Sequence, residues 1–95
     1  MTLSFVAPLW QWEGEGGWHF VTLPAEVADE VRDHAPPRRG FGSVRVTVVV
    51  GESTWQTSLF PETKTGSYVL PVKEPVRRAN DLVVGDQVQV SIRLE

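Results

Sequence analysis

Basic and hydroxyl side chains gather in residues 58–79, which read SLFPETKTGSYVLPVKEPVRRA. Lys73 and Arg77 are four residues apart, so on a helix they would lie side by side. Glu74 and Arg78 have the spacing of a helical ion pair, which would partly neutralise Arg78. Basic groups of this kind hold phosphates and carboxylates through charge-assisted hydrogen bonds. We therefore predict a ligand-binding site for an anionic group, with a solvated helix face beside a polar loop as the alternative. The candidate ligand-binding residues are basic or hydroxyl side chains of this stretch and one arginine of an earlier loop: Lys64, Thr65, Lys73, Arg77, Arg78 and Arg39.

Signatures of catalysis and of metal binding are absent from the sequence. The loop 63–67, TKTGS, lacks the G-x-x-x-x-G-K-[ST] spacing of a phosphate loop. His19 and His34 stand in no metal-binding motif. The carboxylates of residues 26–33 fit an exposed acidic helix face. We predict no catalytic residue, no metal and no cofactor.

The composition of the chain bounds the class of protein. Ninety-five residues, of which 41% are hydrophobic and 22% are charged, predict a single globular domain over residues 1–95. A formal net charge of −3 argues against nucleic acid as a partner. The absence of cysteine is compatible with a reducing compartment. With no signal peptide at residues 1–12 and no apolar run of membrane-spanning length, we predict a cytoplasmic protein without a membrane partner.

The hydrophobic pattern predicts a mainly β protein with two short helices. The expected strands are 3–12, 18–23, 44–50, 54–60, 68–72 and 87–94, and the expected helices are 24–34 and 73–79. On the second helix, Val72, Val76 and Ala79 are predicted to form the buried stripe. Trp10 and Trp12 share strand parity and should point to one face. Core packing is the expected reason for them, and a Trp-lined groove for an aromatic, sugar or peptide ligand is the alternative.

The order of these elements occurs twice along the chain, in residues 3–50 and again in residues 54–94. Each pass has two strands, the second of which ends in Leu-Pro, then a helix and a third strand. Half of the chain is too small to bury a core alone, and two halves that face each other can close a barrel. We therefore predict a six-stranded pseudo-twofold β-barrel with a helix at each end. A monomer is expected, with a weak dimer as the alternative.

The sequence resembles two protein families. Leu70–Pro71, the basic helix after it and LVVGDQVQV at residues 82–90 resemble the unit of AbrB-type swapped-hairpin proteins, which complete their barrel with two chains. Nearly the whole chain resembles a bacterial family called domain of unknown function 1905. Four segments carry that likeness: WHFVTLP at 18–24, RGFGSVRVTVVVG at 39–51, TSLFPETKTGSYVLPVKEPVRRA at 57–79 and VGDQVQVSI at 84–92. The resemblance implies a double-split β-barrel related to the AbrB type, and it implies no chemistry.

Three functions follow as hypotheses. The first is a small non-enzymatic binding module for an anionic small molecule or an acidic segment of a partner protein. The second, a DNA-binding regulator, is argued from the AbrB resemblance alone. The third is an enzyme with a pocket at one end of the barrel.

Overall fold

The computed structural model describes residues 1–34 and 42–95, and the chain there forms six strands and two helices. Their bounds are β1 Thr2–Gln11, β2 His19–Thr22, α1 Ala25–His34, β3 Val44–Val50, β4 Ser53–Glu62, β5 Ser67–Pro71, α2 Glu74–Ala79 and β6 Gln87–Leu94. Each predicted element is present, and the observed bounds differ from the predicted ones by a few residues at most. Neither helix in the described part of the chain has the length and apolar character that crossing a membrane would need.

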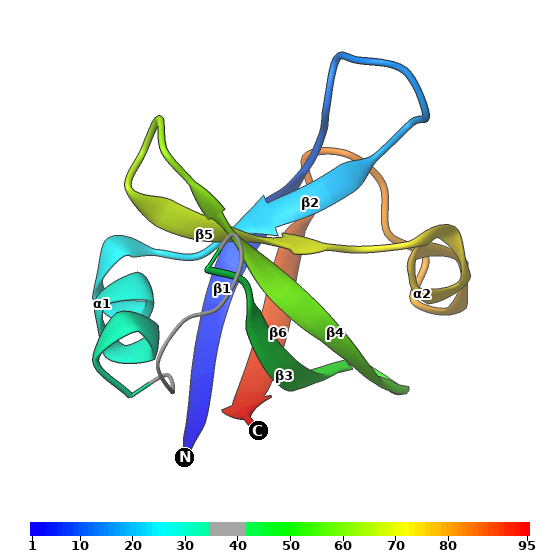
Figure 1. Ribbon diagram of the computed structural model, residues 1–95. Helices are drawn as coiled ribbons and strands as arrows, with labels where there is room; N and C mark the ends of the chain where they lie inside the picture. The colour runs from blue at the N-terminus through cyan, green and yellow to red at the C-terminus, as the bar shows by residue number, and fades with distance from the viewer. Residues whose placement is uncertain (35–41) are drawn as a thin grey trace.

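The strands close into an antiparallel barrel in the order β1-β2-β5-β4-β3-β6, with β6 paired to β1 (Figure 1). Exchange of the first three strands with the last three maps every neighbouring pair onto another neighbouring pair, so the ring has the twofold order expected of two facing halves. The prediction of a six-stranded β-barrel with two short helices is confirmed.

Alternating apolar residues fill the interior of the barrel. On β3, Val46 and Val48 are fully buried, whereas Arg45 between the inward-facing valines is exposed. On β6, Val90 and Ile92 are buried in the same alternation. Successive side chains of a strand point to opposite faces, so this period of two places one face of each strand in the core. The candidate sites therefore lie on the outer surface and at the ends of the barrel.

The two helices lie at opposite ends of the barrel, α1 beside the β4–β5 loop and α2 beyond the far end of β5 (Figure 1). Ala28 and Val31 are buried on α1. On α2 no residue is fully buried: Val76 is half-buried and Ala79 is exposed. The predicted buried stripe is therefore wrong at Ala79, because α2 is a short helix that touches the barrel mainly through Val76 and through Val72 in the segment before it.

Candidate functional site

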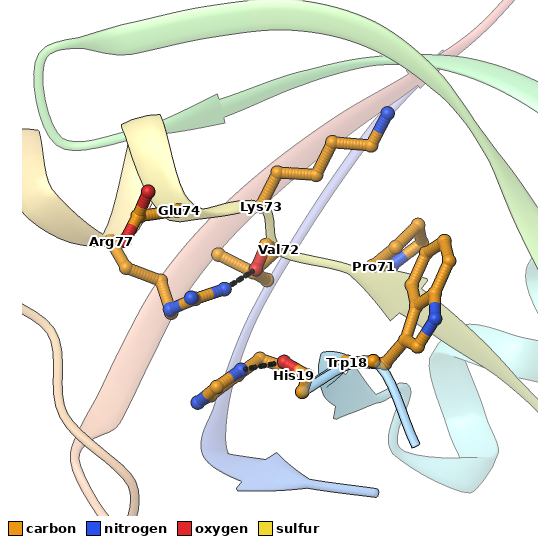
Figure 2. Close-up of a pocket in the computed structure, with 9 residues that line it drawn as sticks. Trp18, His19, Pro71, Val72, Lys73, Glu74 and Arg77 are labelled. Atoms are coloured by element: carbon orange, nitrogen blue, oxygen red, sulfur yellow. Dashed lines mark hydrogen bonds between the residues drawn. The ribbon is translucent and has the colours of Figure 1, made fainter. Parts of the chain in front are cut away.

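A cleft of about 240 Å³ lies between the β1–β2 loop and the segment that joins β5 to α2 (Figure 2). We call it the basic cleft. It is lined by residues of these two segments: Gly16, Gly17, Trp18, His19, Pro71, Val72, Lys73, Glu74 and Arg77. Two of the predicted ligand-binding residues, Lys73 and Arg77, are therefore brought to one cleft.

Backbone pairing between β2 and β5 holds the two walls of the basic cleft together. Phe20 is paired with Pro71 in the antiparallel register, and the Val72 N–H donates to the His19 carbonyl oxygen at 2.9 Å. Across the base of the first hairpin, the Trp12 N–H donates to the Trp18 carbonyl at 2.8 Å. Segments about fifty residues apart in the sequence thus form one rigid frame for the side chains of the cleft.

Arg77 is anchored in the basic cleft by its own local backbone. The half-buried guanidinium donates from Nη1 to the Val72 carbonyl oxygen at 2.6 Å. A guanidinium carries five N–H donors, so this bond leaves the others for a ligand. The bond also fixes the plane of the group, which lowers the entropy that binding an anion would cost.

His19 lines the basic cleft opposite Arg77. Its Nδ1 lies 2.7 Å from the Gly17 carbonyl oxygen. A carbonyl oxygen only accepts, so Nδ1 carries the hydrogen, and Nε2 is the ring nitrogen left for another partner. The imidazole can donate from Nε2 to an anion when the ring is protonated.

Lys73 belongs to the basic cleft but does not lie beside Arg77. It precedes α2 as the N-cap residue, with an extended backbone at φ −77° and ψ 162°. The spacing of four residues therefore does not place the two side chains on one helix face, and Figure 2 shows the Lys73 ammonium extending away from Arg77 and His19. Lys73 is exposed, so it contributes a solvated positive charge at the rim.

The predicted ion pair between Glu74 and Arg78 is confirmed, with 3.4 Å between Arg78 Nη2 and Glu74 Oε2. Both side chains are largely exposed. Arg78 does not line the basic cleft. The pair draws the Glu74 carboxylate toward Arg78, so part of the negative charge beside the cleft is compensated.

Lys64 and Thr65 lie at the opposite end of β5 from α2, in the β4–β5 loop beside α1 (Figure 1). The Thr65 hydroxyl donates to Glu62 Oε1 at 2.7 Å, and Arg32 of α1 donates to the Gly66 carbonyl oxygen. The five residues of β5 separate this loop from the basic cleft, so the structure does not bring Lys64 and Thr65 together with Lys73. The predicted site residue Arg39 lies outside the described residues.

A second hollow, of about 400 Å³, lies on the outer face of β1, β2, β4 and β5. We call it the aromatic groove. It is lined by aromatic rings, one valine and one carboxylate: Trp10, Trp12, Trp18, Phe20, Phe60, Val69 and Glu62. The prediction that Trp10 and Trp12 pack in the core is wrong, because Phe5, Ala7 and Leu9 occupy the inward positions of β1 and leave the even-numbered residues outside. Trp18 lines both hollows.

Clusters that could hold a metal ion are not found among residues 1–34 and 42–95, where no three His, Asp or Glu side chains converge.

The family model described as "Domain of unknown function (DUF1905)" matches residues 5–92. The chain belongs to this family. None of the curated proteins with which the sequence was compared matches it. The family match begins within β1 and ends within β6, so it includes at least part of every strand and all residues that line the basic cleft and the aromatic groove.

The sequence did not indicate that His19 and Trp18 belong to the same cleft as Arg77. His19 shares the parity of the buried Val21 on β2, and it lies half-buried at the start of the strand, whereas Trp18 and Phe20 are on the outer face. The signal that places it in the cleft is the pairing of β2 with β5, and that pairing joins residues far apart in the chain. The repeated order of elements and the Leu-Pro at the end of both strands indicated that β2 and β5 are equivalent, but not that they pair with each other.

Proposed function

We propose that this DUF1905 protein is a small non-enzymatic binding module that holds an anionic group in the basic cleft. The observation that carries the proposal is the half-buried Arg77 guanidinium, fixed by its bond to the Val72 carbonyl and facing a cleft that also receives Lys73 and His19. The anionic group would belong to a small molecule or to an acidic side chain of a partner segment. The absence of cysteine from the sequence is in keeping with a role in the cytoplasm.

Electrostatics in the basic cleft supports an anion over a cation. Lys73 and Arg77 carry two positive charges, and Glu74 carries one negative charge that is shared with Arg78 outside the cleft. Coulomb energies between exposed charges are small, about 1 kcal/mol at 4 Å in water. A bidentate contact with the fixed guanidinium adds charge-assisted hydrogen bonds, which are the stronger part of the interaction.

The size of the cleft supports a small anionic head group. Pockets that take drug-sized ligands usually measure about 300–1,000 Å³, and the basic cleft measures about 240 Å³. Trp18 and Pro71 form an apolar wall beside the basic groups (Figure 2). A carboxylate or phosphate with a short apolar stem would therefore fit both parts of the cleft.

The test is a titration with inorganic phosphate and, separately, with a blocked tetra-aspartate peptide, at constant ionic strength set with sodium chloride. Backbone amide shifts of residues 16–19, 72–74, 76 and 77 report binding. We expect millimolar affinity for phosphate, a loss of about threefold in Lys73→Gln, and a loss of about fivefold or more in Arg77→Gln. Tighter capture of the peptide than of phosphate would assign a partner segment as the ligand.

Matched control variants remove the same charge outside the basic cleft. Lys64→Gln is the control for Lys73→Gln, because Lys64 lies at the other end of β5. Arg93→Gln is the control for Arg77→Gln, because Arg93 is an exposed residue of β6 and does not line the cleft. Equal losses in all four variants would refute the assignment of the cleft. Salt-dependent capture of duplex DNA, included as a third probe, would replace the proposal with a DNA-binding function.

A further inference from the structure

The rings of the aromatic groove are held in a fixed arrangement by their neighbours. Trp10 donates from Nε1 to the Thr22 hydroxyl at 2.9 Å, which sets the orientation of its indole. The Phe20 ring lies 5.1 Å from the Trp10 ring and 6.2 Å from the Trp18 ring, between centroids, and it is nearly parallel to Trp18. The rings of Trp10 on β1, Phe20 on β2 and Trp18 just before β2 thus form one continuous aromatic surface.

The Trp12 ring lies against the β1–β2 turn at Gly14, which has no side chain. A Cβ atom built on Gly14 would overlap the six-membered part of the Trp12 indole. Glycine therefore lets the ring lie directly against the turn, although half of the Trp12 surface is exposed to solvent. An exposed tryptophan that is ordered by the backbone is prepared for contact with a ligand, because little freedom is lost on binding.

The charge in the aromatic groove is negative. Glu62 is the charged side chain among the lining residues, and Lys and Arg are absent from the described lining. The Thr65 hydroxyl donates to Glu62 Oε1, which holds the carboxylate in place and leaves it a further acceptor. Aromatic faces carry negative quadrupole density and attract cations within about 6 Å of the ring. The rings and the carboxylate therefore favour the same kind of ligand.

We propose that the aromatic groove binds a small organic cation of the quaternary ammonium type. A methylated ammonium group has an apolar surface that packs on Trp12, Trp18 and Phe60, and its charge is attracted both by the ring faces and by Glu62. A neutral ligand of the same shape gains the packing alone, and an anion is repelled by the carboxylate. This site is separate from the basic cleft, and Trp18 is the residue that the two share.

The experiment compares choline with 3,3-dimethylbutan-1-ol, which has the same shape without the charge. Tryptophan fluorescence is recorded in a Trp55→Phe background, since Trp55 packs against the core and does not line the groove. Ionic strength is matched with sodium chloride. We expect choline to bind at least about fivefold more tightly than the neutral alcohol.

Two further variants separate charge and ring from plain apolar contact. Glu62→Gln should weaken choline about threefold and leave the alcohol unchanged. Phe60→Leu keeps an apolar side chain and removes a ring, so it should lower the preference for choline over the alcohol. Circular dichroism checks that each variant is folded. The proposal is overturned by equal affinity for the two probes, by no response to choline at millimolar concentration, or by a preference that both variants leave intact.

Discussion

Asn80 connects the C-terminal end of α2 to the turn between β3 and β4. We predict that the losses of stability caused by Asn80→Ala and Gly51→Ala are not additive, because both substitutions break the same contacts. Asn80 Nδ2 donates to the Ser53 hydroxyl at 3.0 Å and to the Val76 carbonyl at 2.9 Å. Its Oδ1 accepts from the Glu52 N–H at 3.2 Å. Gly51 lies in the same turn with φ +54°, and a Cβ built on it would overlap Asn80 Oδ1.

The expected free energies of unfolding follow from these contacts. Asn80→Ala removes three partly exposed hydrogen bonds and should cost about 2 kcal/mol. Gly51→Ala should cost about 1 kcal/mol for a left-handed backbone and about 2 kcal/mol more because the new methyl group displaces the Asn80 side chain. In the double variant the Asn80 side chain is already gone, so Gly51→Ala adds only its backbone cost of about 1 kcal/mol to the cost of about 2 kcal/mol for Asn80→Ala. The double variant should therefore lose about 3 kcal/mol of stability, whereas additive effects would give about 5 kcal/mol.

This cycle is measured by urea unfolding of the parent, both single variants and the double variant. An equal slope of unfolding free energy against urea concentration in all four proteins checks that unfolding is two-state. Losses that add to within about 0.5 kcal/mol would refute the reasoning, because they would mean that Asn80 and Gly51 do not interact. Since α2 carries Arg77, Asn80→Ala should also weaken phosphate binding in the basic cleft, and this effect should be absent in Thr54→Ala, an exposed residue of β4.

Three further predictions concern the hairpin of β4 and β5, its contact with α1, and the basic cleft. Ser67→Ala removes the buried bond from the Ser67 hydroxyl to the Leu23 carbonyl at 2.7 Å; it should cost about 1.5 kcal/mol, or roughly 6–12 °C in Tm by calorimetry, and an unchanged Tm would contradict it. Arg32→Met removes the bond to the Gly66 carbonyl and the guanidinium 5.8 Å from the Tyr68 ring centroid; urea unfolding should show a loss of about 1 kcal/mol, whereas an effect below about 0.3 kcal/mol would mean that α1 does not depend on it. Glu74→Gln removes the carboxylate beside the basic cleft and should tighten phosphate about twofold in the amide-shift titration; weaker binding would count against the electrostatic argument.

The valine-rich strands were predictable because their two faces differ in polarity. On β3, Arg45 and Thr47 alternate with buried valines, so the pattern identifies the strand and also its inward face. On β1 the pattern does not choose a face, since Val6, Pro8 and Trp10 are as apolar as Phe5, Ala7 and Leu9. The choice is made by pairing with β6, where Phe5 lies opposite the inward-facing Val90. The local pattern does not reveal long-range pairing, and the sequence alone therefore predicts, wrongly, that Trp10 and Trp12 pack in the core.

The candidate site was predicted in part for a similar reason. Arg77 and Lys73 reach the same cleft because they are close in the chain. Lys64 was grouped with them because one short strand separates the two segments, but an extended strand of five residues spans about 16 Å. The ends of such a strand face opposite ends of the barrel, and the loop lies beside α1 instead. His19 enters the cleft through the pairing of β2 with β5, which the sequence did not reveal.

The two longest strands of the barrel change neighbours along their length. In β1, Thr2–Pro8 pair with β6 and Leu9–Gln11 pair with β2. In β4, Ser53–Leu59 pair with β3 and Phe60–Glu62 pair with β5. The longer part of each strand is therefore paired on one side in the described chain, and such an edge presents the N–H and C=O groups to which an extended peptide can add. Recognition by this fold can thus use main-chain bonds at these two edges as well as side chains in the hollows.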